Sequence, residues 1–227
     1  MKRGLVLGLL MTLPLVAAAG TFPRQVTIEY RGYWRFLPVG SAVQTWSLQG
    51  NRYHLETRMS GFGKAVRYVS DGMVANDQLL PLQYGEYRDK NTSPTYVARF
   101  DWNAKQVVYG RTNEPPKSGE LVAPAQDLNT VPYDLAWRDA RPVAYAIVTN
   151  GRSIKGAGLA RAGEDSYDVG DTEVETVHLV SRRGDETTDF WLAPALYHLP
   201  VRIKYNGSEK IELKATKIIV DGRTVAE

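Results

Sequence analysis

The sequence predicts an all-β protein: a single curved antiparallel sheet, or half-open β-barrel, with one short helix packed against it. Apolar and polar residues alternate with a period of two in many short segments; in residues 25–31, for example, Val26, Ile28 and Tyr30 share one face. Turn-forming residues separate these segments at intervals of about 8–12 residues. Only residues 127–137 have a helical pattern. We expect about ten or more strands.

The first half of the chain reads as a series of hairpins. Residues 49–52 have the composition of a tight turn between two alternating segments, and Asp71-Gly72 indicates another turn. The predicted strands are residues 25–31, 42–49, 53–59, 66–70, 83–88, 95–102 and 106–109. Residues 111–124 contain three prolines and no periodicity, which predicts a loop.

The helix is predicted near residues 129–138. Asp127 or Asn129 can cap it, and Pro132 fits its first turn, where the amide protons have no partner within the helix. Leu128, Val131 and Leu135 would face the sheet. The simplest arrangement is one helix on the inside of a curved sheet.

The second half returns to alternation. Thr149-Asn150-Gly151-Arg152 reads as a hairpin turn, and the Gly-rich segment 153–161 as a bent strand. Residues 187–203 read as a strand, a turn marked by Pro194, and a second strand. The remaining predicted strands are residues 143–148, 166–169, 174–181, 201–205 and 211–216.

Residues 1–19 have the pattern of a secretory signal peptide, and residues 20–227 are predicted to form one β-rich domain. Lys2 and Arg3 precede an apolar run that ends in small residues. The run is shorter than the roughly 18–20 residues that span a bilayer, which favours cleavage over an uncleaved anchor. The chain has no Cys, so no lipid can be attached to one. We expect a periplasmic protein without a membrane span after cleavage.

Charge and residue types exclude several functions. Lys and Arg number 28 and Asp and Glu 25, a near balance that does not predict a nucleic-acid partner. His54, His178 and His198 lack the spacing of a metal site and adjoin no nucleophile motif. The carboxylates cluster at turns. The sequence therefore predicts no catalytic residue, no metal and no cofactor.

The candidate ligand-binding residues are aromatic. Tyr33, Trp34 and Phe36 lie in a segment that alternates aromatics with arginines, and Trp46 and Trp191 complete the set. Such aromatics could line the mouth of an apolar cavity, or simply pack on a strand at the sheet rim. Trp191 points away from its strand neighbours, so both faces of that strand carry apolar residues. A second packed layer, a covering loop and a ligand cavity all fit this pattern.

Several pieces of the sequence resemble one known family. Trp191-Leu192-Ala193-Pro194 and Leu199-Pro200-Val201-Arg202 are the more specific pieces; they are preceded, in order, by Phe100-Asp101-Trp102, Gln126-Asp127 and Asn150-Gly151-Arg152. Together they resemble the exported bacterial family called domain of unknown function 3108, from about Val26 to Lys217. The resemblance implies no assigned activity. By fold analogy alone it is similar to the half-open barrels of periplasmic lipoprotein carriers.

Three functions follow as hypotheses. The first is a non-enzymatic envelope protein that binds an apolar or amphipathic ligand, a lipid or a lipoprotein, in the concave face of the sheet. The second is an interaction module that holds an envelope protein partner through a sheet edge or the loop at residues 110–126. The third, with least support, is a hydrolase of envelope polymers, which would need a histidine beside a Ser or an acid in a cleft.

Overall fold

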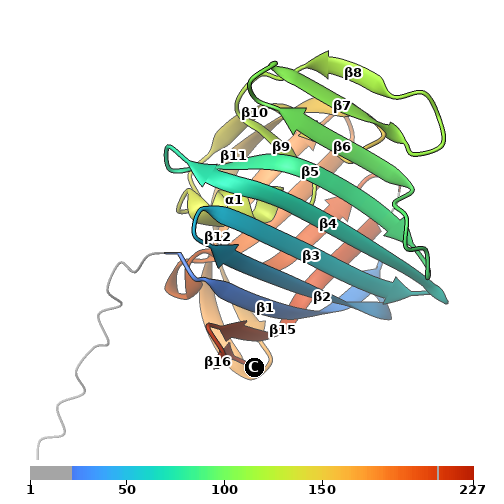
Figure 1. Cartoon of the computed structure of the whole chain (residues 1–227). Helices are drawn as coiled ribbons and strands as arrows, with labels where there is room; N and C mark the ends of the chain where they lie inside the picture. Colours follow the sequence, from blue (N-terminus) through green and yellow to red (C-terminus); the bar gives the residue numbers. More distant parts are fainter. Residues whose placement is uncertain (1–21, 209) are drawn as a thin grey trace, which may run out of the picture.

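The structure is a computed structural model that describes residues 22–208 and 210–227. In these residues one sixteen-stranded sheet curves around a single α-helix (Figure 1). The sheet is not closed: β8 and β9 are the ends of the order β8-β7-β6-β5-β4-β3-β2-β1-β15-β14-β13-β12-β11-β10-β9, and β16 pairs with β15. The predicted all-β class with one short helix is confirmed. The predicted signal peptide lies outside the described residues.

The strands are long compared with most predicted segments. Their bounds are β1 Gln25–Trp34, β2 Leu37–Gln49, β3 Arg52–Gly61, β4 Lys64–Ala75, β5 Gln78–Arg88, β6 Tyr96–Asp101, β7 Gln106–Arg111, β8 Lys117–Glu120, β9 Ala125–Asp127, β10 Val143–Thr149, β11 Ile154–Val169, β12 Thr172–Arg183, β13 Glu186–Ala193, β14 Leu199–Asn206, β15 Lys210–Val220 and β16 Arg223–Ala226. A 3₁₀ turn, η1 (Pro194–Leu196), joins β13 to β14.

Two antiparallel meanders share the pairing of β1 with β15. The first runs from β1 to β8 and the second from β10 to β15. Between them the chain crosses the inside of the sheet through β9 and helix α1 (Val131–Trp137), and β9 pairs in parallel with β10. Figure 1 shows the first meander in front, the second behind, and α1 at one end between them. We call the face of the sheet that surrounds α1 the concave face.

Helix α1 is held inside the sheet by apolar packing. Val131 and Leu135 pack with Phe190 and Leu192 of β13. The helix is shorter than predicted and begins one residue after Thr130, whose backbone N–H donates to Oδ1 of Asp127 at 3.0 Å. Thr130 is the N-terminal cap residue and makes no side-chain capping hydrogen bond, so the predicted cap at Asp127 or Asn129 is wrong. Asp127 instead fixes the turn that precedes the helix.

An aromatic stack fills the same end of the concave face. The ring of Trp46 lies between those of Tyr53 and Tyr133, with centroids 5.1 and 5.2 Å away and nearly parallel planes. Phe22 meets Trp46 edge-on at 5.6 Å. The indole N–H of Trp46 donates to the carbonyl of Pro23 at 3.1 Å. This end of the sheet is closed by packed side chains.

A buried polar network fixes the segment that precedes α1. Gln44 donates to Thr57 at 2.9 Å, Thr57 donates to Asn129 at 2.6 Å, and Asn129 donates to Ser70 at 3.1 Å. Ser70 donates to Asp127 at 2.7 Å. Because buried polar groups are costly without partners, this network specifies where the segment crosses β2, β3 and β4.

The predicted turn at Asp71-Gly72 is wrong. Strand β4 continues to Ala75, with a register shift between Asp71 and Gly72 in its pairing with β5. A Cβ at position 72 would lie 2.2 Å from the ring of Tyr53, so glycine is needed there for the close approach of that ring. Residues 117–120, predicted as loop, form the short edge strand β8.

Candidate functional site

The structure places Trp34 and Phe36 at an exposed hairpin tip. Trp34 ends β1, and Phe36 and Leu37 follow in the turn and in β2, with 93% of Phe36 exposed. At the neighbouring β3–β4 tip Phe62 is 69% exposed, and its ring meets that of Trp34 edge-on at 6.2 Å. We call Trp34, Phe36, Leu37 and Phe62 the apolar rim.

Tyr33 and Trp46 lie elsewhere. The Tyr33 ring is 5.1 Å from the ammonium of Lys214. Lys214 lies on the outer face of the sheet, in one cross-strand row with Arg202 and Trp191. Trp46 is packed at the α1 end, where only 2% of it is exposed. The structure therefore brings Trp34 and Phe36 near each other but does not gather the five aromatics into one site.

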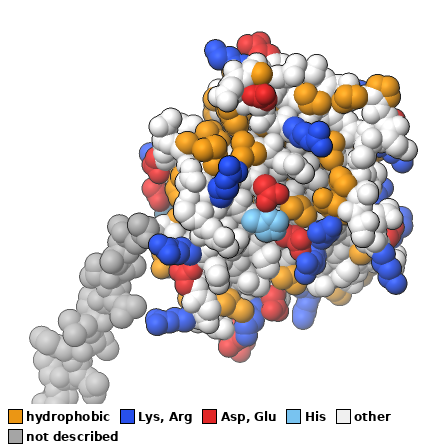
Figure 2. Space-filling view, viewed as in Figure 1, with side chains coloured by type: hydrophobic (Ala, Val, Ile, Leu, Met, Phe, Trp, Pro, Cys, Tyr) orange, Lys and Arg blue, Asp and Glu red, His pale blue; other side chains and the backbone are white. Residues whose placement is uncertain are grey.

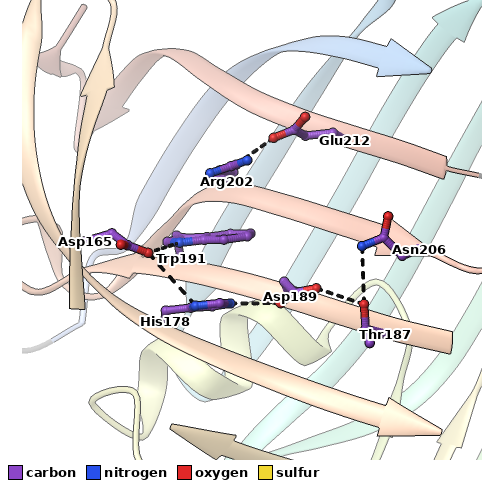
Figure 3. A network of polar contacts seen from close by, with 8 residues as sticks. All are labelled: Asp165, His178, Thr187, Asp189, Trp191, Arg202, Asn206 and Glu212. Carbon is purple, nitrogen blue, oxygen red and sulfur yellow. Dashed lines mark hydrogen bonds and ion pairs between the residues drawn. The ribbon is translucent and has the colours of Figure 1, made fainter. Parts of the chain in front are cut away.

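Trp191 belongs to a stacked row on the outer face (Figure 3). The row consists of His178 from β12, Trp191 from β13 and Arg202 from β14. The imidazole lies 4.2 Å from the indole at an interplanar angle of 10°, and the guanidinium carbon lies 4.2 Å from the indole on the next strand. Asp165 of β11 accepts the indole N–H at 2.7 Å. The opposite face of β13 packs against α1, and Trp191 itself is only 6% exposed beside Asp165, so both faces of this strand are covered.

The polar groups around this row do not form a hydrolytic triad. His178 Nε2 is 2.9 Å from Asp189, and the hydroxyl of Thr187 donates to the same carboxylate at 3.1 Å. The carboxylate therefore lies between imidazole and hydroxyl, whereas a triad needs the imidazole beside the nucleophile. Asn206 donates to Thr187 at 3.4 Å, and Arg202 donates to Glu212 at 2.6 Å (Figure 3).

The other two histidines also face acids. His54 Nδ1 is 2.7 Å from Asp71, with both side chains about half exposed, and His198 is 3.8 Å from Asp139. Partial burial lowers the pKa of His198, against the opposing effect of Asp139. Among residues 22–208 and 210–227 no group of three His, Asp or Glu side chains is placed to hold a metal ion.

Two hollows are found on the surface of the part of the chain that the structure describes. The larger, about 850 Å³, lies between the β3–β4 tip and the β5–β6 turn and includes Phe62, Lys64 and Lys90 in its lining. The smaller, about 480 Å³, is lined by residues of β4 to β7 such as Phe100 and Trp102. None of the three histidines lines either hollow. On the face in Figure 2, apolar, basic and acidic side chains are interspersed, without a broad field of one charge.

The concave face differs at its two ends. Around α1 it is filled, but towards the apolar rim its apolar side chains are only partly buried. The register places Met59 and Val66 in one row with Tyr30, and Leu213 beside Ile203, all on this face. The partly exposed inward side chains are Met59, Val66, Tyr68, Ile203, Ile211 and Leu213. We call this set the open end of the concave face.

An ion cluster adjoins the open end at the gap between the two meanders. Glu86 of β5 points inward and is 3% exposed. Arg152, in the β10–β11 turn, donates to both of its oxygens at 2.7 and 2.8 Å, and Nε of Arg88 donates at 2.7 Å. This two-point contact joins β5 to the second meander where no backbone ladder does so.

The sequence analysis did not predict this cluster, although two features of the sequence indicate it. Glu86 shares a face with Tyr84 in an alternating segment, and an acid on a buried face needs a cationic partner. Arg152 stands in the predicted Asn-Gly hairpin turn, where a cation has no evident partner in the local sequence. Their sequence separation of 66 residues hid the pairing.

The chain matches the model of a known protein family over most of its length. The model of the family described as "Protein of unknown function (DUF3108)" matches residues 29–214, most of the chain. The chain belongs to the DUF3108 family. No curated protein matches it. The pieces that resemble the family hold structural positions: Trp191 and Arg202 in the stacked row, Asp127 beside α1, and Arg152 on Glu86.

Across residues 22–208 and 210–227, no helix is both long and apolar enough to cross a bilayer.

Proposed function

We propose that this DUF3108 protein is an exported, non-enzymatic protein of the cell envelope that binds an apolar or amphipathic ligand, a lipid or the acyl part of a lipoprotein. The ligand would lie at the open end of the concave face. One observation carries the proposal: inward apolar side chains remain partly exposed there and lead to the apolar rim.

The energetic argument concerns surface that the chain leaves uncovered. Burial of apolar surface contributes about 25 cal/mol per Å², or about 0.8 kcal/mol for each methylene of a ligand. Exposed groups such as Phe36 and Phe62 would be covered by an acyl chain that extends out of the concave face. A contiguous exposed apolar surface with a polar border is typical of a binding site.

The export part of the proposal comes from the sequence. Residues 1–19 have the signal-peptide pattern and lie outside the described residues. A periplasmic address would bring the protein close to membrane lipids and lipoproteins. The balanced charges and the mixed surface in Figure 2 support a ligand other than nucleic acid.

Native mass spectrometry of the protein purified gently from periplasm, followed by organic extraction, tests the proposal. We expect a bound lipid of defined mass. Phe62→Asp should weaken binding of a fluorescent apolar probe, whereas Val122→Asp should not, because Val122 is also exposed (46%) but stands in the segment between β8 and β9, outside the rim. Repeated ligand-free masses, together with equal probe binding by both variants, would overturn it.

A protein partner is the second candidate. Within the described residues, strand β8 is one end of the open sheet and pairs only with β7. An edge of this kind can accept a strand from another chain. Crosslinking in intact cells from a site on β8 and from a site on the apolar rim would separate the two candidates: protein adducts would favour a partner and lipid adducts the carrier.

A further inference from the structure

Three arginines surround one tyrosine beside the open end. Tyr68, Glu86, Tyr96 and Arg111 are successive cross-strand neighbours from β4 to β7. The same row begins with Gln44 and Thr57, whose bonds to the segment before α1 identify its face as the concave one. The charged groups therefore share a face with the apolar side chains of the open end.

The guanidinium groups converge on Tyr96. The guanidinium carbon of Arg152 lies 4.5 Å from the ring centroid, and those of Arg88 and Arg111 lie 6.0 Å away. All three side chains are about half exposed, at 42%, 48% and 48%. Glu86 holds Arg88 and Arg152 in place, Arg111 lies against the same ring, and all three remain accessible to a ligand.

The cluster carries more positive than negative charge. Glu86 occupies Nε of Arg88 and one terminal nitrogen of Arg152. Arg111 forms an ion pair with Glu114 at 3.6 Å, and that carboxylate is 60% exposed. A guanidinium has five N–H donors in a planar fork that matches carboxylate and phosphate groups. Arg111 and the remaining donors of its neighbours can therefore bind an anion.

We propose that Arg88, Arg111 and Arg152 bind the anionic headgroup, a carboxylate or a phosphate, of an amphipathic ligand. The apolar chain of that ligand lies against Val66 and Tyr68, the cross-strand neighbours of Arg88 and Glu86. This inference rests on the proposed function and adds the ligand class: an anionic amphiphile with its headgroup at the gap between the meanders and its chain toward the apolar rim.

Arg111→Gln is the variant of choice because Arg111 does not contribute to the contact between Glu86 and Arg152. Arg99→Gln is the matched control: Arg99 lies on the adjacent strand β6 and is exposed, but its position alternates with Ala98 and Phe100, so it faces away from the cluster. Equal urea midpoints would show that both variants fold like the wild type.

Calorimetric titration would use a long-chain fatty acid, its methyl ester, a phosphate-headed lysolipid and inorganic phosphate. A charge-assisted hydrogen bond corresponds to about tenfold or more in affinity, so the acid should bind at least about tenfold more tightly than the ester. Arg111→Gln should remove most of this difference and leave the ester unchanged. Arg99→Gln should change neither ligand. The relative affinity of acid and lysolipid identifies the headgroup.

The outcomes separate this inference from the proposed function. If acid and ester bind equally and Arg111→Gln has no effect, the headgroup inference is overturned while apolar binding stands. If no amphiphile binds, the proposed function itself fails. If inorganic phosphate alone binds as tightly as the lysolipid, the cluster is a simple anion site and the inference of an amphiphile is overturned.

Discussion

Replacement of Asp127 by asparagine should change how the stability of the protein depends on pH. Asp127 is fully buried, and burial raises its pKa to about 6, although hydrogen bonds from Ser70 and Thr130 act in the opposite direction. The ordinary value is 3.8. The folded state therefore binds this proton more tightly than the unfolded chain does.

The sign follows from this difference. The protonated Asp127 carboxyl makes a stabilising contribution to the free energy of unfolding that is fully present below about pH 4. This contribution is lost as the pH rises through about 6, because the folded state must then bury a charge. A difference of about two pKa units corresponds to about 3 kcal/mol in the free energy of unfolding. Asparagine stays neutral and can keep the bonds from Ser70 and from the Thr130 amide, so Asp127→Asn removes this term.

Urea unfolding followed by tryptophan fluorescence, between pH 4 and pH 7.5, measures the effect. The difference in the free energy of unfolding between the variant and wild type should shift in favour of the variant by about 3 kcal/mol from pH 4 to pH 7.5. Asp185→Asn, at an exposed turn position, should give a curve parallel to wild type. Parallel curves for Asp127→Asn and wild type would refute the argument that burial of the Asp127 carboxylate sets this pH dependence.

Three further substitutions test buried hydroxyl groups and the contact between the two meanders. Tyr133→Phe should leave the free energy of unfolding unchanged or raise it by up to about 1 kcal/mol, because the Tyr133 hydroxyl is buried without a hydrogen-bond partner in the described residues. Tyr145→Phe should lower it by about 1.5–3 kcal/mol, because Tyr145 donates to Asp134 at 2.6 Å. The same cost for both variants in urea unfolding would contradict this reasoning. Glu86→Gln should lower the free energy of unfolding by about 1–3 kcal/mol. The loss is smaller than for a fully buried pair because Arg152 is 42% exposed and its guanidinium can be hydrated. An unchanged urea midpoint would show that the contact does not hold the meanders together.

The fold class could be predicted because strand alternation and turn residues are local signals. Residues 25–31 show the period of two that β1 has in its burial pattern, and the Pro194 turn separates β13 from β14 as expected. Local signals also caused the errors. Asp71-Gly72 has the composition of a turn, but Gly72 makes room for the ring of Tyr53, which the sequence around position 72 does not reveal.

The candidate site could be predicted only in part. Trp34 and Phe36 lie at an exposed tip as a rim aromatic should, and alternation correctly places Trp191 opposite Phe190. Whether the outer face of β13 is covered depends on the course of β11, which has a register shift between Arg161 and Gly163. Beyond that shift Asp165 accepts the indole N–H of Trp191, which is 26 residues away in the sequence. The Glu86–Arg152 contact likewise depends on how far the open sheet curves, a property of all its strands together.

The lengths of the elements explain why one end of the concave face stays open. Helix α1 has 7 residues and spans only about 10 Å, at 1.5 Å per residue. Strand β2 has 13 residues and spans about 43 Å, at about 3.3 Å per residue. A helix this short can cover the inward side chains of β2 and its neighbours over only a fraction of their length. The apolar side chains beyond it must meet across the sheet or face solvent, and those of the open end are partly exposed. The proposed ligand therefore covers surface for which the described chain supplies no covering element.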